Sequence, residues 1–212
     1  RYSGTALTPS FTVSLNGVKL VQDLDYSVTY LSNKNVGTAK VVICGKGVYT
    51  NSLTKTFTIR PETMASAVIT GCKAKYSYTG KQVKPLIQVV WNGKILRNNT
   101  DYTLLYKNNK KRGSAGIVVT GKGNYSSTLT ASFTIVRASV KKASVTGLKA
   151  VYARTGKAVK PKVTVKLGGK KLKKKRDYIL SYRKNKKKGT ALLYVKGVGN
   201  YSGTKKMKFK IR

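Results

Sequence analysis

The chain has 212 residues, 40% of them hydrophobic and only four of them proline, so it can fold around a core. Its 44 Lys and Arg residues stand against 5 Asp and Glu residues, a formal net charge of +39. Charge of this size repels itself unless anions screen it, which predicts a polyanionic partner. Histidine is absent, which removes the commonest general base and metal ligand. We therefore expect a protein that is not an enzyme and holds neither cofactor nor metal.

An internal repeat of 76 residues runs through the whole chain without insertion or deletion. The residues that recur at this offset are Pro9, Pro85 and Pro161; Asp25-Tyr26, Asp101-Tyr102 and Asp177-Tyr178; Tyr30, Tyr106 and Tyr182; Tyr49, Tyr125 and Tyr201; and Phe57, Phe133 and Phe209. The repeat predicts three domains, 1–60, 61–136 and 137–212, here called the first, second and third copies. The first copy lacks the 16 residues that open the others.

In chain order, apolar residues alternate with period two, which predicts half-buried strands. The expected inward-facing residues of the first copy are Phe11, Val13, Leu15, Tyr26, Val28, Tyr30, Ala39, Val41, Ile43, Leu53, Phe57 and Ile59. The second copy repeats them as Ile87, Val89, Trp91, Tyr102, Leu104, Tyr106, Ala115, Ile117, Val119, Leu129, Phe133 and Ile135. The third copy has Val163, Val165, Leu167, Tyr178, Leu180, Tyr182, Ala191, Leu193, Val195, Phe209 and Ile211.

Turn signals separate these strands. Asn16-Gly17, Asn92-Gly93 and Gly168-Gly169 predict two-residue hairpins, because these residues tolerate a positive φ. Residues 65–70 predict a further strand, whose first-copy counterpart would precede Arg1, so the first copy would miss an edge strand. The pattern predicts an all-β fold of tandem antiparallel β-sandwiches with about seven strands in each complete copy.

The motif order resembles bacterial immunoglobulin-like (Ig-like) repeats of Gram-positive surface proteins and cell-wall hydrolases. The resemblance is carried by Tyr78-Thr79-Gly80-Lys81, Asn92-Gly93-Lys94, Asp101-Tyr102 and the stretch 121–135, and it covers nearly the whole chain. It implies Ig-like domains of a secreted or cell-surface protein. Because the chain opens in mid-pattern, we expect an export signal upstream. The third copy departs from the pattern at Arg154, which stands where Tyr2 and Tyr78 stand.

The few groups capable of chemistry have simpler structural interpretations. Asp25, Asp101 and Asp177 are expected to cap a turn by accepting backbone N–H groups. A second hypothesis makes them the acid of Lys–Asn isopeptide bonds, although no inward-facing lysine recurs in all copies. Tyr49, Tyr125 and Tyr201 resemble corner residues, with a packed ring and a hydroxyl bonded to backbone. Trp91 is expected in the core, with stacking on a carbohydrate as the alternative. Cys44 and Cys72, at non-equivalent positions, are not expected to pair.

Positive charge rises steeply along the chain. The first copy has 7 basic and 2 acidic residues (+5), the second 11 and 2 (+9), and the third 26 and 1 (+25). The third copy keeps the inward-facing residues and changes the outward ones. Its candidate polyanion-binding residues form two loop runs, at opposite ends of strand 178–182, and one alternating series. They are Lys170, Lys171, Lys173, Lys174, Lys175 and Arg176; Arg183, Lys184, Lys186, Lys187 and Lys188; and Lys206, Lys208 and Lys210.

Lysine outnumbers arginine, which suits diffuse attraction to a polyanion rather than bidentate recognition. The expected function is a non-catalytic binding or spacer segment, a monomeric rod within a larger protein. Its last copy would attach to an anionic cell-wall polymer, such as teichoic acid, or to an acidic host glycan. Nucleic acid would bind without specificity. The alternative is an adhesin segment whose loops recognise one host protein or glycan, with the charge incidental.

Overall fold

The computed structural model describes residues 1–212 and contains strands, one short 3-10 helix and no α-helix. No helix is long or apolar enough to cross a membrane. The chain divides into two compact units, Arg1–Gly71 with Ile87–Leu105 and Ile117–Ala131, and Cys72–Leu86 with Tyr106–Gly116 and Ser132–Arg212. The division runs through the second copy, and the assignment of three domains stays a prediction.

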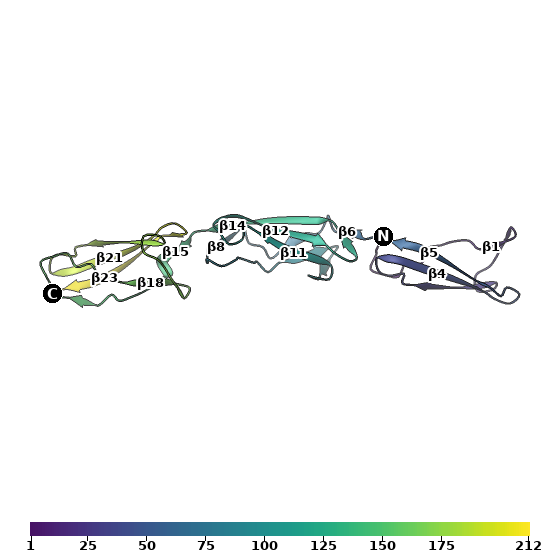
Figure 1. The fold of residues 1–212 in the computed structure, drawn as a ribbon, viewed down its shortest axis with the longest axis horizontal. Helices are drawn as coiled ribbons and strands as arrows, with labels where there is room; N and C mark the ends of the chain where they lie inside the picture. Colours follow the sequence, from purple (N-terminus) through teal and green to yellow (C-terminus); the bar gives the residue numbers. More distant parts are fainter. The chain divides into compact units, whose positions relative to one another are not determined.

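The first copy contains a two-stranded hairpin and a three-stranded sheet (Figure 1). Its strands are β1 (Ser14–Leu15), β2 (Val18–Lys19), β3 (Tyr26–Leu31), β4 (Gly37–Gly45) and β5 (Ser52–Ile59). The sheet order is β3-β4-β5, and all its pairs are antiparallel. The predicted Asn16-Gly17 turn is confirmed, with φ of 50° and 82°.

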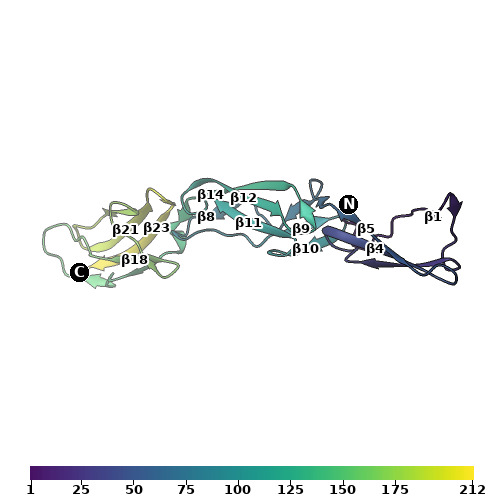
Figure 2. The same cartoon turned by 45° about the vertical axis from the view of Figure 1, so that its right-hand side comes forward.

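The second copy repeats this hairpin and sheet and adds strands to both (Figure 2). The sheets are ordered β10-β9-β7 and β11-β12-β14-β8, with a separate β13-β6 pair. The strands are β6 (Glu62–Thr63), β7 (Val68–Thr70), β8 (Lys75–Ser77), β9 (Gln88–Trp91), β10 (Lys94–Leu96), β11 (Tyr102–Lys107), β12 (Gly113–Gly121), β13 (Tyr125–Ser126) and β14 (Thr128–Val136). The strand expected at 65–70 begins only at Val68, because Ala67 N–H closes a turn onto the Met64 carbonyl (2.9 Å).

The third copy has the same plan. Its sheets are ordered β16-β18-β19 and β17-β23-β21-β20, with a β15-β22 pair. The elements are β15 (Ala138–Ser139), η1 (Val140–Lys142), β16 (Ser144–Thr146), β17 (Val151–Tyr152), β18 (Thr164–Leu167), β19 (Lys170–Lys171), β20 (Tyr178–Arg183), β21 (Gly189–Gly197), β22 (Tyr201–Ser202) and β23 (Thr204–Ile211). The two sheets hold the predicted seven strands, and the short β15-β22 pair adds two that the sequence did not predict.

The larger sheets are not purely antiparallel, which corrects the sequence prediction. The edge strand β17 runs parallel to β23, and β8 runs parallel to β14. Each of these edge strands carries a tyrosine that meets the closing phenylalanine edge-to-face. Tyr152 lies 5.4 Å from Phe209 and Tyr76 lies 5.2 Å from Phe133, between ring centroids. Aromatic packing thus fastens a strand that arrives from a distant part of the copy.

One core joins the two sheets of the third copy. Its buried residues are Ala138, Val140, Ala143, Val165, Leu172, Tyr178, Ala191, Leu193, Val195, Tyr201, Phe209 and Ile211. Val163, Leu167, Leu180 and Tyr182 are half-buried against it, so every residue predicted to face inward in the third copy is buried or half-buried. The period-two alternation therefore located this core correctly, since successive strand residues face opposite sides.

In the first copy, Tyr26, Val41 and Ile43 form a buried cluster with partly buried neighbours, and Ala39 and Ile59 are buried as well. Three residues expected to face inward are exposed instead: Phe11 at 38%, Leu15 at 50% and Leu53 at 49%. Leu15 lies in the hairpin β1-β2, which has no third strand, whereas β9 and β18 each pair with a further strand; Leu53 lies in β5 of the other sheet. Without that strand the apolar side of the hairpin stays open to solvent.

Ring packing and hydroxyl bonding to backbone, both predicted for one set of recurrent tyrosines, belong to two different sets in the structure. Tyr125 and Tyr201 are buried, and their rings meet Tyr2 and Tyr78 edge-to-face at 5.6 and 5.7 Å. The Tyr125 hydroxyl, however, accepts a bond from a lysine ammonium rather than bonding to backbone. The tyrosines that bond to backbone are instead Tyr30, Tyr106 and Tyr182. Tyr182 Oη donates to the Pro161 carbonyl (2.8 Å), and the other two donate to the equivalent prolines.

Trp91 is half-buried, and its ring meets that of Tyr125 edge-to-face at 5.6 Å, so it packs beside the core rather than inside it. Cys44 and Cys72 are both free thiols. They do not form a disulfide, as expected from their non-equivalent positions in the repeat.

Candidate polyanion-binding surface

A single carboxylate organises the first basic run of the third copy. Asp177, the only acidic residue of this copy, accepts the Lys173 backbone N–H at 2.8 Å. The Arg176 guanidinium donates to both of its oxygens, at 3.0 and 2.9 Å. Asp25 and Asp101 accept the equivalent N–H groups at 2.7 and 2.8 Å, so the predicted turn cap is confirmed in all copies.

The electrostatics of the turn follow from these bonds. The Arg176 guanidinium lowers the pKa of the Asp177 carboxyl, and the Lys173 N–H lowers it further, while burial opposes both. The carboxylate therefore stays ionised and holds the turn closed around it. Arg176 is thus already paired, which leaves Lys173, Lys174 and Lys175 of this turn to meet an external anion.

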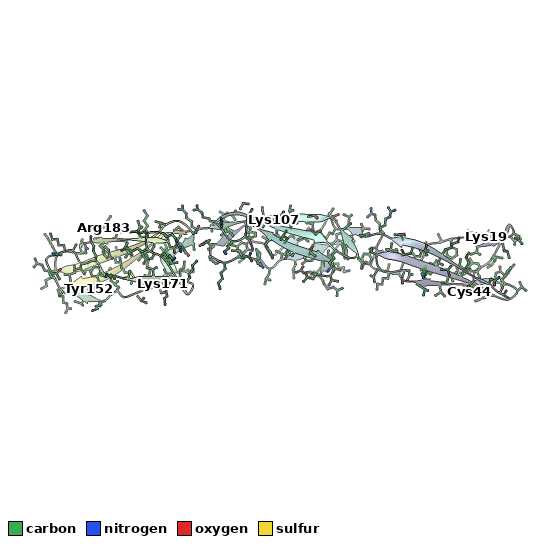
Figure 3. All side chains as sticks on the ribbon, viewed as in Figure 1. Lys19, Cys44, Lys107, Tyr152, Lys171 and Arg183 are labelled. Carbon is green, nitrogen blue, oxygen red and sulfur yellow. The ribbon has the colours of Figure 1, made fainter.

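The first run is not wholly a loop, which corrects the prediction. Lys170 and Lys171 form β19 and pair with Leu167 and Lys166 of β18. The Lys170 ammonium lies 5.9 Å from the centroid of the Tyr78 ring, a cation–π contact with the preceding copy. Lys171 is exposed, and Figure 3 labels its position on the third copy.

The second run begins at the far end of β20, as predicted. Arg183 closes that strand, and its guanidinium lies 5.7 Å from the centroid of the Tyr194 ring (Figure 3). Asn185 fixes the loop through reciprocal bonds with the Val159 backbone, at 2.7 and 2.8 Å. The exposed lysines around it line a shallow cleft of about 550 Å³ formed by residues 184–190.

The alternating series lies on β23. Lys206, Lys208 and Lys210 are all exposed, while Phe209 and Ile211 between and beyond them are buried. These lysines therefore share the outer side of the sheet, roughly 7 Å apart along the strand. The structure places the three groups of candidate residues on different parts of the third copy and does not gather them into one pocket.

Among the exposed lysines that sequence reasoning left out of the candidate set, two lie beside members of the first run. Lys160 and Lys162 line a groove together with Lys171, Lys173 and Lys174. The available signal was the substitution at Lys162, whose counterparts are Ser10 and Leu86. The groove itself depends on the fold, because its walls come from separated segments.

Other polar groups of the chain make structural contacts. No group of three His, Cys, Asp or Glu side chains is placed to hold a metal ion. The ammonium groups of Lys46 and Lys122 donate to the carbonyls of Asp23 and Asn99 at 3.2 and 2.9 Å, as ordinary turn contacts. No buried side-chain nitrogen or oxygen lacks a hydrogen-bond partner.

Comparison with known proteins adds no relative: no protein-family model, no curated protein and no solved structure matches this chain.

Proposed function

We propose that this chain is a non-catalytic segment of a bacterial cell-surface protein, and that its third copy attaches noncovalently to an anionic polymer. The main support for the proposal is that the third copy keeps the buried apolar residues of the repeat while its surface becomes strongly basic. Core positions such as Leu193 and Phe209 stay apolar and buried, while the copy holds 26 basic residues against one acidic residue. Solubility alone needs a net charge of only about 2 to 8 in a small domain.

The chemistry of the surface suits a polymer. Lysine ammonium groups are compact point charges on flexible stems and do not impose the planar fit that arginine does. The lysines lie on several parts of the copy, so a long anion can touch many of them in turn. Binding would release counter-ions from the polymer and would weaken as salt rises.

The proposed fold and location rest on the resemblance to Ig-like repeats. The arrangement of three and four strands around one core supports an Ig-like sandwich for the third copy. A protein with such domains at the surface of a Gram-positive cell would meet teichoic acids first and acidic host glycans next. Nucleic acid is the weaker partner, because no exposed aromatic platform accompanies the charge.

The test measures binding of the full chain to poly(glycerol phosphate), to a sulfated polysaccharide and to an uncharged polysaccharide. We expect binding to both polyanions that falls at least about a hundredfold between roughly 50 and 500 mM salt, and no binding to the uncharged polymer. The matched variant takes second-copy residues at outward positions: Lys174→Asn, Lys175→Asn, Lys184→Asn, Lys206→Thr, Lys208→Ser and Lys210→Thr.

This variant should bind more weakly and with a shallower salt dependence, because fewer counter-ions are released. Lack of binding to any polyanion at low salt would overturn the proposal. Binding to a single glycan that persists at high salt would instead support recognition by loops.

A further inference from the structure

The third copy carries a groove with an apolar floor and a rim of lysines. The groove has a volume of about 760 Å³, within the range of roughly 300–1,000 Å³ that ligand sites occupy. One wall is the segment that enters β18, and the opposite wall is the turn between β19 and β20. All of its lining residues belong to the third copy.

The floor is built from core residues whose sides reach the groove. Leu172 and Tyr178 are buried, whereas Val163, Leu180 and Tyr182 are half-buried and present part of their surface. The bond from the Tyr182 hydroxyl to the Pro161 carbonyl, 2.8 Å long, fixes the ring and ties one wall to β20. The floor is therefore apolar and held in place by the fold.

The rim consists of Lys160, Lys162, Lys171, Lys173 and Lys174, all of them exposed. None of these ammonium groups takes part in an ion pair, since the salt bridges of the chain are those of Arg97 and Arg176. The only nearby carboxylate, Asp177, is occupied by Arg176 and the Lys173 backbone. Five positive charges thus surround the groove with no internal counter-charge.

Comparison of the three copies separates the floor from the rim. The floor positions are apolar or tyrosine in every copy: Phe11, Leu20, Tyr26, Val28 and Tyr30, then Ile87, Leu96, Tyr102, Leu104 and Tyr106. The rim positions differ: Thr8, Ser10, Lys19, Val21 and Gln22, then Lys84, Leu86, Ile95, Arg97 and Asn98. Basic residues at the rim number one, two and five in successive copies, whereas the floor stays apolar or tyrosine in all three.

We propose that this groove binds a short stretch of an anionic polysaccharide. The carbon–hydrogen faces of the sugar rings would pack on Val163 and Leu180, and the acidic groups would meet the rim lysines. A sugar polymer offers both features, whereas a nucleic acid strand needs open aromatic faces for its bases. Tyr178 is 4% exposed and Tyr182 is half-buried, so neither ring is open for base stacking.

This inference rests on the proposed function and narrows it to one place and one class of polymer. The experiment uses the full chain with a sulfated octasaccharide as the probe and inorganic polyphosphate, which has no sugar rings, as the comparison. The groove variant replaces its rim lysines by glutamine: Lys160, Lys162, Lys171, Lys173 and Lys174. The matched control replaces an equal number elsewhere on the third copy: Lys184, Lys187, Lys188, Lys206 and Lys208.

Both variants lose the same charge, so diffuse attraction weakens equally in each. We expect the groove variant to lose at least about tenfold more affinity for the octasaccharide than the control loses. Val163→Thr, which keeps the side-chain shape, should weaken octasaccharide binding and leave polyphosphate binding unchanged. Melting temperatures close to that of the parent chain will show that the variants are folded.

Equal losses in the two charge variants would overturn the groove and leave the proposed function intact. Failure of the parent chain to bind any polyanion would overturn the proposed function itself. Equal sensitivity of polyphosphate and octasaccharide to Val163→Thr would show that sugar faces do not use the floor.

Discussion

Replacing Asp177 by asparagine tests how one carboxylate holds the basic turn of the third copy. Asparagine keeps an oxygen that can accept the Lys173 N–H, but it loses the charge that attracts Arg176. A hydrogen bond to a charged group contributes about 1.5–3 kcal/mol, against about 1 kcal/mol for a neutral one. The side chain of Arg176 is 58% exposed, so its ion pair adds little. We therefore expect Asp177→Asn to destabilise the turn by about 1–2 kcal/mol.

The stability that Asp177 contributes should also depend on pH in a defined direction. The pKa of Asp177 is lowered in the folded chain, mainly by its bond from Arg176. A lowered pKa means that the stabilisation is complete above the unfolded value, about 3.9, and is lost as pH falls through the folded value. The difference in stability between the parent chain and Asp177→Asn should thus be full at neutral pH and should vanish in acid.

Hydrogen exchange of the Lys173 amide is the suitable assay, because it reports on this turn alone while the unfolding signals of the three copies overlap. Exchange should be about 5- to 30-fold faster in Asp177→Asn at neutral pH. Asp101→Asn is the matched control, since the Arg97 Nε lies 3.9 Å from that carboxylate and the charge lost there has a weaker partner. Unchanged exchange at Lys173, or an acid dependence that persists in Asp177→Asn, would refute the reasoning.

Two further predictions concern the scaffold. A duplicate of residues 61–76 placed before Arg1 should give the β1-β2 hairpin its third strand and raise the first-copy melting temperature by about 4–8 °C or more; an unchanged melting curve would contradict this. Gly197→Ala should destabilise the third copy by about 1–3 kcal/mol in urea unfolding, because the added Cβ would lie 2.7 Å from the Ser202 nitrogen. Gly116→Ala, with its nearest neighbour at 3.9 Å, should be harmless, and equal effects of the two substitutions would count against the steric argument.

Much of the scaffold could be read from the sequence because its signals are local or periodic. Alternation of period two identified Leu193, Val195 and Phe209 as core residues, since a strand turns successive side chains to opposite sides. Asn92-Gly93 predicted a hairpin because both residues readily adopt positive φ, here 45° and 76°. The carboxylate of Asp177 caps a turn only four residues away, which is also a local interaction.

The tertiary structure decided what depends on pairing between distant segments. Lys160 and Lys173 line one groove because β18 and β19 form a hairpin, and β20 of the other sheet supplies part of the groove floor. The parallel edge strand β17 and the exposure of Leu15 likewise depend on which strand has a neighbour, and side-chain periodicity carries no information about partners. The sequence by itself thus determined the repeat, the inward residues and the charge on the third copy. The fold determined which lysines lie together at the rim of the groove and which apolar residues form its floor, because only strand pairing brings these separated segments together.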